Sequence, residues 1–331
     1  MSIFSRHIII QKNTSLISHL SCLLLFFALM PGYAAAQSNT TIYGYLDLGI
    51  AKQSGKSAGI ERGYNNWLGI HGQEDLGNGL SAVFRLETRF YADTGETERP
   101  LTAWQGETTV GLQSTTYGTL RLGRAITPLW DAAWQYEPWI NSALNASLAS
   151  YQTGSYGSDG IHDVTLGYAD ATRISNGIYY SSPTWNGLTV HAAFRADKDP
   201  AADSRVRSFS MYYTHNNWSS VLAHEVNAHS DDITYIASKY RLHAFTFMGS
   251  WTRHRPADAQ QERTWMTAGT YEFGHHMLRA GYGRNQLNHQ QKFSIGYVHK
   301  LSKRTSLYAD LYRERQQDYL NGFALGMTHS F

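Results

Sequence analysis

NGFALGMTHSF, residues 321–331, decides the fold class of this chain. Successive side chains of a β-strand point to opposite faces. In this stretch one face would hold large, mostly apolar side chains, namely Phe323, Leu325, Met327, His329 and Phe331. The other face would hold small or polar residues, namely Gly322, Ala324, Gly326, Thr328 and Ser330. A strand with one face for lipid, one face for water and an aromatic residue at its end is typical of a transmembrane β-barrel.

The first strand-like segment, residues 40–50, repeats this alternation. Its apolar face carries Ile42, Gly44, Leu46, Leu48 and Ile50, and its other face carries Thr41, Tyr43, Tyr45, Asp47 and Gly49. Asp47 is therefore expected to face a water-filled lumen. In the next segment, residues 66–72, Leu68 and Ile70 would face lipid, while Trp67 and His71 would face the lumen.

Residues 80–91 separate a membrane barrel from a soluble β-sandwich. Ala82, Phe84, Leu86 and Thr88 point one way, and Val83, Arg85, Glu87 and Arg89 point the other way. A sandwich could also hold such a strand, but sandwich strands are usually about 5 to 7 residues long. The strand-like segments of this chain run to about 8 to 11 residues, which is the length of a tilted membrane-spanning strand.

Sixteen such segments follow one another along the chain, and the links between them alternate in length. The segments lie near residues 40–50, 66–72, 80–91, 105–113, 119–125, 176–182, 188–195, 206–214, 218–226, 232–240, 243–253, 262–273, 275–285, 292–300, 305–314 and 322–331. Short links are expected at residues 74–79, 187, 215–217, 241–242, 274 and 301–304. Short turns at one end and long loops at the other are typical of bacterial barrels. The sequence thus predicts an all-β fold, a 16-stranded antiparallel transmembrane β-barrel.

The N-terminal residues are predicted to be a secretory signal peptide. Arg6 and Lys12 precede a short apolar run at residues 23–31, and Ala34-Ala35-Ala36 supplies the small residues of a cleavage site. We expect residues 1–36 to be removed, which leaves residues 37–331 as one barrel domain without cysteine. An exported chain without disulfides needs another source of stability, and a closed hydrogen-bonded barrel provides it. The mature chain has little net charge, so nucleic acid is not an expected partner.

One connection is far longer than the others. About 50 residues, 125–174, show no clear strand period. A loop of that length in a compact domain is unusual unless it has a function. Sixteen strands enclose an open aqueous lumen, and a long loop folded inward would narrow it. We therefore expect residues 125–174 to form an inward-folded third outer loop that constricts the lumen.

Taken together, these segments resemble the trimeric general porins of β-proteobacteria, including the neisserial type. The resemblance covers essentially all of residues 37–331 and rests on the order and spacing of several short stretches. These are residues 41–47 (TIYGYLD), 72–79 (GQEDLGNG), 80–87 (LSAVFRLE), 110–112 (VGL), 120–124 (LRLGR), 127–131 (TPLWD), 180–183 (YSSP), 301–308 (LSKRTSLY) and the C-terminal strand. The resemblance implies a sixteen-stranded barrel in the outer membrane of a Gram-negative bacterium, with the third outer loop folded into the pore.

The resemblance also implies a function and a set of partners. The function would be passive diffusion of inorganic ions and small hydrophilic solutes, with no enzymatic activity and no cofactor. The partners would be two further copies of the chain in a homotrimer, the lipid of the outer membrane, and the assembly machinery for which Phe331 would be the signal. Gly44 and Ala82 are small residues on the expected lipid face, which favours close contact between copies.

Charged side chains at the narrowest point would set the sign of the preferred ion. In the family, basic residues of the wall face acidic or carbonyl groups of the loop. The basic candidates are Arg124, which matches a basic position of the family, and Arg85, Arg89 and Arg121. The acidic candidates are Asp131 and Glu137, and the other residues expected to face the lumen are Trp67, His71, Asp47 and Glu87. The alternative for each is a wall residue in water, away from the constriction.

Two departures from the family leave the sign of the selectivity open. Trp67 and Gly106 stand where the family commonly has arginines. The anion preference often found in the family therefore does not carry over to this chain from the resemblance alone.

The long loop also carries several aromatic residues, Trp134, Tyr136, Trp139, Tyr151 and Tyr156. They would form either an aromatic track for sugars or anchors that hold the loop to the wall, and anchoring is the simpler hypothesis. The histidines His224, His229, His275 and His276 show no spacing typical of a metal site, so no metal is expected.

Two further classes of barrel compete with a channel. An outer-membrane hydrolase would need a nucleophile beside a histidine base, and the sequence has no GxSxG motif. A plugged or adhesive barrel would need larger outer loops or a more apolar lumen face.

Overall fold

A computed structural model describes residues 38–63, 66–99, 102–139, 146–159, 171–197 and 202–331. The expected signal peptide lies outside these residues, and so do parts of the expected constriction loop. Residues 37–331 form one compact unit of the chain. No helix in the described part is long and apolar enough to cross a membrane.

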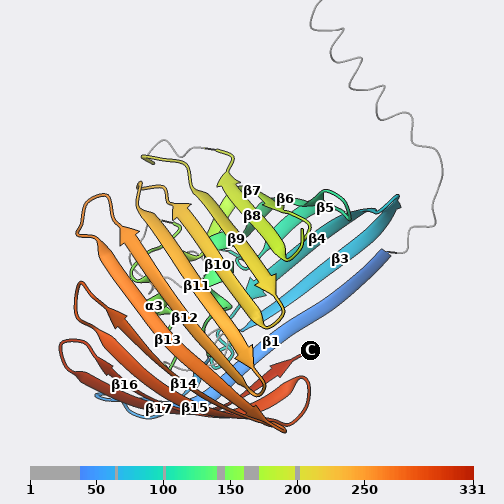
Figure 1. Ribbon diagram of the computed structural model, residues 1–331. Helices are drawn as coiled ribbons and strands as arrows, with labels where there is room; N and C mark the ends of the chain where they lie inside the picture. Colours follow the sequence, from blue (N-terminus) through green and yellow to red (C-terminus); the bar gives the residue numbers. More distant parts are fainter. Residues whose placement is uncertain (1–37, 64–65, 100–101, 140–145, 160–170, 198–201) are drawn as a thin grey trace, which may run out of the picture. The chain divides into compact units, whose positions relative to one another are not determined.

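An antiparallel sheet closes on itself to form a barrel (Figure 1). The strands are β1 (Ser38–Gln53), β2 (Gly59–Arg62), β3 (Trp67–Gly77), β4 (Leu80–Arg89), β5 (Thr108–Ser114), β6 (Gly118–Ile126), β7 (Arg173–Ser181), β8 (Leu188–Arg195), β9 (Arg207–His215), β10 (Trp218–Val226), β11 (Asp232–Leu242), β12 (Phe245–Arg255), β13 (Glu262–Phe273), β14 (His276–Asn285), β15 (Gln291–Lys300), β16 (Thr305–Arg315) and β17 (Tyr319–Ser330). Apart from β2, each strand pairs with its neighbours in sequence, and β1 pairs with β17. The predicted sixteen-stranded antiparallel barrel is therefore confirmed.

Some predicted boundaries are wrong, and β2 was not predicted. β2 is a short strand that pairs with residues 48–51 of β1. The turn expected at residues 74–79 is shorter, because β3 continues to Gly77. The turn expected at residues 241–242 lies after Leu242, where His243 has a positive φ of 54°. The two turn errors share a cause: the ladder of backbone hydrogen bonds continues past the point where side-chain hydropathy stops alternating.

The two faces of the sheet differ as the alternation predicts. The outer face bears large exposed apolar side chains, among them Ile42, Leu68, Phe84, Val110, Leu122, Ile236, Phe247, Ile295, Leu325 and Met327. Their neighbours along each strand point inward and are mostly polar, such as the buried Asp47, Glu87 and Asp310. A soluble protein rarely exposes apolar side chains over such an extent, so this outer surface suits lipid.

β1 and β17 pair from Tyr45↔Ser330 to Gln53↔Gly322 and so close the barrel, and Phe331 extends this pairing at the end where short turns join the strands. Gly44 and Phe331 exchange two backbone hydrogen bonds, each 3.1 Å long. The Phe331 ring covers Gly44 so closely that a Cβ at Gly44 would overlap the ring. Tyr308 on β16 covers Gly326 on β17 in the same manner, since the two residues are direct partners across the strands. Glycine under an aromatic ring thus recurs where the last strand docks.

The segment between β6 and β7 carries two short helices, α2 (Pro128–Trp134) and α3 (Ser150–Thr153). Thr127 caps α2 by accepting a hydrogen bond from the Trp130 amide, and Pro128 suits its first turn. Buried residues of α2, including Leu129 and Ala133, pack against inward-facing Tyr212, Ala223 and Tyr235 of β9, β10 and β11. α3 packs against β11 to β14. The described parts of this segment therefore line one side of the barrel interior.

Candidate functional site

A cluster of arginines and glutamates lies on the inner face of β3 to β7, away from the strands that carry α2 and α3. Glu107 joins two of the arginines. Arg121 Nη1 donates to Glu107 Oε1, and Arg85 Nη1 lies 3.4 Å from Glu107 Oε2. The Arg85 side chain is 47% exposed and that of Arg121 is 27% exposed, against 9% for Glu107. The positive groups of this set therefore meet the water of the lumen, while the carboxylate lies behind them.

Glu87 forms a second, more deeply buried junction. Tyr43 donates a hydrogen bond of 3.0 Å to Glu87 Oε2, while Arg89 and Arg173 lie 3.6 Å and 4.0 Å from Oε1. Arg89 is only 4% exposed. Its guanidinium lies 5.9 Å from the centre of the Trp67 ring, which stacks on Tyr45. Arg89 and Glu87 are thus buried in the inner side of the barrel wall.

Arg124 lies at a bulge of β6 between Gly123 and Ala125. Its Nε donates to the Gln105 carbonyl at 3.1 Å, and its Nη1 donates to the Ser175 hydroxyl at 2.9 Å. Arg124 therefore links β6 to the β4–β5 connection and to β7. Its role at a constriction stays a prediction.

Gly106, one of the two departures from the family, is surrounded by charged residues. A Cβ at Gly106 would clash with Glu87 Oε1, so the position has no room for a side chain unless Glu87 moves. Arg173 Nε donates to the Gly106 carbonyl at 2.6 Å. Arg173, which sequence reasoning missed, thus supplies a positive charge at the place where the arginine of the family is absent. Its only sequence signal was its position beside Ile174, at the end of the long connection and next to a strand.

The two acidic candidates of the loop lie in different surroundings. Asp131, on α2, is exposed, and its carboxyl lies near the charged groups His191 and Arg121. Glu137 is 4% exposed, and its carboxylate oxygens accept hydrogen bonds from the amides of Trp139 (2.9 Å) and Leu148 (2.8 Å). Burial raises the pKa of Glu137 to about 7. Glu137 therefore holds the loop together and presents little negative charge to the lumen.

The aromatic residues of the loop bond to the wall through their polar atoms. Trp139 Nε1 donates to Asp310 Oδ1 at 2.9 Å, and the Tyr151 hydroxyl donates to Glu314 Oε1 at 2.8 Å. The Tyr136 hydroxyl lies 2.9 Å from Ser219 Oγ. Trp134 packs in the same buried cluster as α2, with its ring 6.3 Å from that of Trp130. These contacts favour anchors over a sugar track, because the rings are packed against the wall and their polar atoms are hydrogen-bonded to it.

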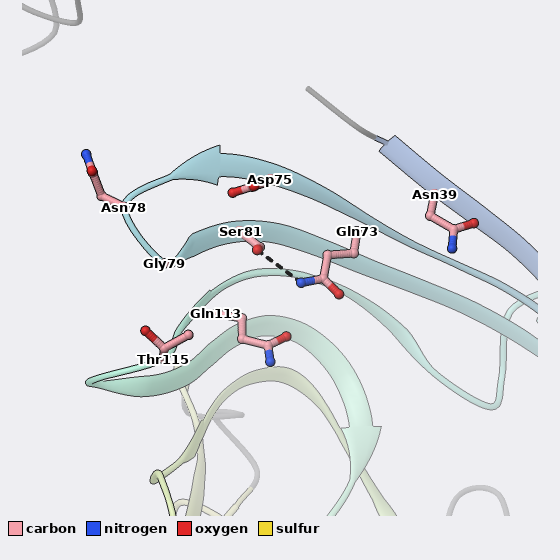
Figure 2. A pocket seen from close by; sticks show the side chains of 8 residues that line it. All are labelled: Asn39, Gln73, Asp75, Asn78, Gly79, Ser81, Gln113 and Thr115. Atoms are coloured by element: carbon pink, nitrogen blue, oxygen red, sulfur yellow. Dashed lines mark hydrogen bonds between the residues drawn. The ribbon is translucent and has the colours of Figure 1, made fainter. Parts of the chain in front are cut away.

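A polar hollow continues from the Glu107 cluster to the short-turn end of the barrel. Its volume is about 700 Å³, and it is lined by amides, hydroxyls and one carboxylate, as Figure 2 shows: Asn39, Gln73, Asp75, Asn78, Gly79, Ser81, Gln113 and Thr115. Gln73 donates a hydrogen bond of 3.0 Å to Ser81. Gln73 and Gln113 also line a neighbouring hollow of about 220 Å³ that contains Arg85, Arg121 and His71. A hydrated solute thus meets polar groups along this whole wall.

Comparisons with known proteins agree with this architecture. A family model described as Gram-negative porin matches residues 22–319. Outer membrane porin protein 32 of Delftia acidovorans is 26% identical over 85% of this chain and 85% of its own length. An outer membrane porin protein of Bordetella pertussis is 31% identical over 55% of this chain and 51% of its own length. Among solved structures, an anion-selective porin from Comamonas acidovorans superposes with a TM-score of 0.77 at 20% identity, covering 89% of this chain and 100% of that one.

Proposed function

The chain belongs to the Gram-negative porin family, and we propose that its channel prefers small anions because of the charged wall of β3 to β7. The chain is an outer-membrane porin, a barrel whose water-filled interior lets ions and small hydrophilic solutes diffuse passively. The short-turn end then faces the periplasm, as in other bacterial barrels. We infer that the connection between β6 and β7 narrows the pore, because its described helices α2 and α3 pack against the inner side of β8 to β14.

The observation that carries the anion preference is the excess of arginine over carboxylate on this wall. Its arginines are Arg85, Arg89, Arg121, Arg124 and Arg173, and its carboxylates are Asp75, Glu87 and Glu107. Glu87 and Glu107 each lie within 4.0 Å of at least one arginine, so neither offers its charge alone, and Asp75 lies in the polar hollow toward the short-turn end. Fixed positive charge in a narrow, partly buried passage raises the local concentration of anions.

The loop opposes this positive wall with one exposed carboxylate, because Glu137 is buried. Asp131 lies exposed on α2, near Arg121 and His191. Burial raises the pKa of Glu137 to about 7, so Glu137 carries only part of a negative charge near neutral pH. The solved porin from Comamonas acidovorans is described as anion-selective, which agrees with the proposal.

The test is the reversal potential across a planar bilayer with unequal salt on the two sides. The double variant Arg85→Gln, Arg121→Gln removes the two most exposed charges beside Glu107 and leaves that carboxylate without these two cations. We expect its reversal potential to move toward cations by more than either single variant does. Arg255→Gln is the matched control, because Arg255 pairs with Asp232 at 2.9 Å at the long-loop end of β12, away from this wall. An unchanged potential in the double variant would show that the wall does not set the selectivity.

Export and assembly complete the proposed functional unit. Residues 1–36 direct export and are removed, so that Gln37 begins the mature chain. Three copies assemble through their outer faces, where Ala82 is small, whereas Gly44 is covered by the Phe331 ring of its own chain. In the same recordings, voltage-driven closure of a trimer proceeds in three equal steps, and closure of every channel in one step would contradict the trimer.

A further inference from the structure

Two histidines and a tyrosine meet on the outer face of the barrel, beside the turn that joins β13 to β14. His276 is the first residue of β14, and it pairs directly with His299 of β15. His276 has the same orientation as Leu278, and His299 the same as Tyr297, both of which are exposed on the outer face. The set is not apparent in the sequence, because its residues share a site only after β14 and β15 pair.

His276 Nδ1 lies close to polar atoms of both neighbours. His276 Nδ1 lies 2.6 Å from the Tyr297 hydroxyl oxygen and 3.2 Å from His299 Nδ1. A neutral imidazole nitrogen either carries one proton or offers one lone pair. His276 Nδ1 can therefore form one full hydrogen bond, and it meets its other neighbour either through a shared proton or lone pair to lone pair. The close approach of the two imidazole Nδ1 atoms is the contact that a single hydrogen bond to Tyr297 leaves unexplained.

A metal ion bound to both imidazoles accounts for their close approach, and the spacing of the two Nδ1 atoms suits such an ion. Zinc binds imidazole nitrogen at about 2.0 to 2.1 Å in tetrahedral geometry, which places two such nitrogens roughly 3.3 to 3.4 Å apart. The distance between the two Nδ1 atoms is 3.2 Å. Imidazole with an oxygen donor is a ligand set that zinc, copper and nickel accept.

The site is also accessible and held in place. It borders an open hollow of about 360 Å³ lined by His276, Tyr297, His299, Leu307, Tyr308 and Ala309. The His276 ring stacks on that of His299 at 4.8 Å and on Phe273 at 5.1 Å, so the strand pairing and the neighbouring rings fix its orientation. Across the described residues, no group of three or more His, Cys, Asp or Glu is placed to hold a metal. This set, with two histidines and a tyrosine, is of a different kind.

We propose that His276 and His299, with Tyr297 beside them, form a binding site for a divalent transition metal of the zinc, copper and nickel class. The two imidazole Nδ1 atoms are the protein ligands, and water completes the coordination. The Tyr297 oxygen lies 2.6 Å from His276 Nδ1, closer than two ligands of one tetrahedral zinc ion, so Tyr297 borders the metal-bound water and is not itself a ligand. A metal bound here ties β14 to β15 at the periplasmic rim, where the lipid headgroups lie.

The experiment is a calorimetric titration of the full mature barrel, folded in detergent and without a histidine tag, with Zn²⁺ as the chloride. We expect one high-affinity site per chain. His276→Gln and His299→Gln should each weaken it at least about tenfold, since even the loss of an outer-shell partner typically costs about 10 to 100-fold. Tyr297→Phe should weaken it less, because both imidazoles remain.

His215→Gln is the matched control. His215 is an exposed histidine at the same end of the barrel, and it stacks on a tyrosine, Tyr213, at 6.4 Å, but its partner across the strands is Trp218 and not a histidine. Its substitution should leave the affinity unchanged. Cu²⁺ added at one equivalent gives a second measurement, since its electron paramagnetic resonance spectrum should show two bound nitrogens in the wild type and one in His299→Gln.

Each variant must still form channels in a planar bilayer. A variant that forms channels but binds zinc weakly has lost the metal site and not the fold. A wild-type protein that forms no channels would contradict the porin assignment instead. Zinc affinity equal in wild type, His276→Gln and His299→Gln would overturn the proposal. So would an equal loss in His215→Gln, which would mean adventitious binding to exposed histidines.

Discussion

At the residue scale, the buried carboxyl of Glu137 makes the stability of the loop depend on pH. Its pKa rises from 4.5 to about 7 on burial. The folded loop thus favours the protonated form, so this contribution to stability is complete below about pH 4.5 and is lost as the pH rises through about 7. The effect is on the order of 3 kcal/mol at most, from about 1.4 kcal/mol per pKa unit.

Hydrogen exchange at the amides of Trp139 and Leu148, which donate to Glu137, measures this effect. After correction for the intrinsic rate, their protection should fall between about pH 5.5 and about pH 8.5 in the wild type, a window around the raised pKa. In Glu137→Gln it should be lower overall, because one acceptor is lost, but independent of pH. A wild-type protection that does not change over this range would refute the shifted pKa.

The alternation of side chains predicted which face each charged group occupies but not its partner. Glu87 and Arg89 were expected in the lumen, and they lie on the inner face, but a buried junction with Tyr43 and Arg173 holds them in the wall. Partners across a sheet depend on strand register and on loops far away in sequence, which a single strand pattern does not contain. For the same reason Arg173 and Glu107 could not be identified from the sequence.

At the scale of the strands, the sequence was most informative. Long alternating segments predicted the sixteen barrel strands, because lipid on one side and water on the other impose a period of two on every strand. β2 was missed because its four residues, GIER, are too few to show that period. α2 and α3 were missed because their apolar residues pack on the inner side of the barrel wall. The sequence of a loop does not show that the folded loop will lie against such a surface.

The contact of Phe331 with Gly44 leads to a prediction for strand closure. Gly44→Val would place side-chain atoms where the Phe331 ring now lies, since even a Cβ there overlaps the ring. We expect a lower yield of folded barrel, seen as a smaller fraction that shifts its mobility on heating in a denaturing gel. Gly59→Val is the control, because no described atom lies within 4 Å of a Cβ at Gly59. An equal folded yield in the two variants would show that closure of the barrel does not require a glycine beneath the Phe331 ring.

At the scale of the whole molecule, the features combine into one passage. The closed sheet excludes lipid, the segment with α2 and α3 occupies the side of β8 to β14, and the charged wall of β3 to β7 remains open to water. The polar hollow of Figure 2 then continues this wall toward the periplasm. Solutes would pass between the anchored loop and the arginines, and then along the amides, the hydroxyls and the single carboxylate, Asp75, of this hollow.

The most direct test of this account is single-channel recording of the purified mature protein in a planar bilayer that separates concentrated from dilute potassium chloride. The account predicts discrete, long-lived conductance steps that grow with salt concentration, as in a water-filled pore, and a reversal potential displaced toward the equilibrium potential of chloride. A displacement toward that of potassium would contradict the proposed anion preference. The absence of any conductance from correctly folded protein would contradict the channel itself.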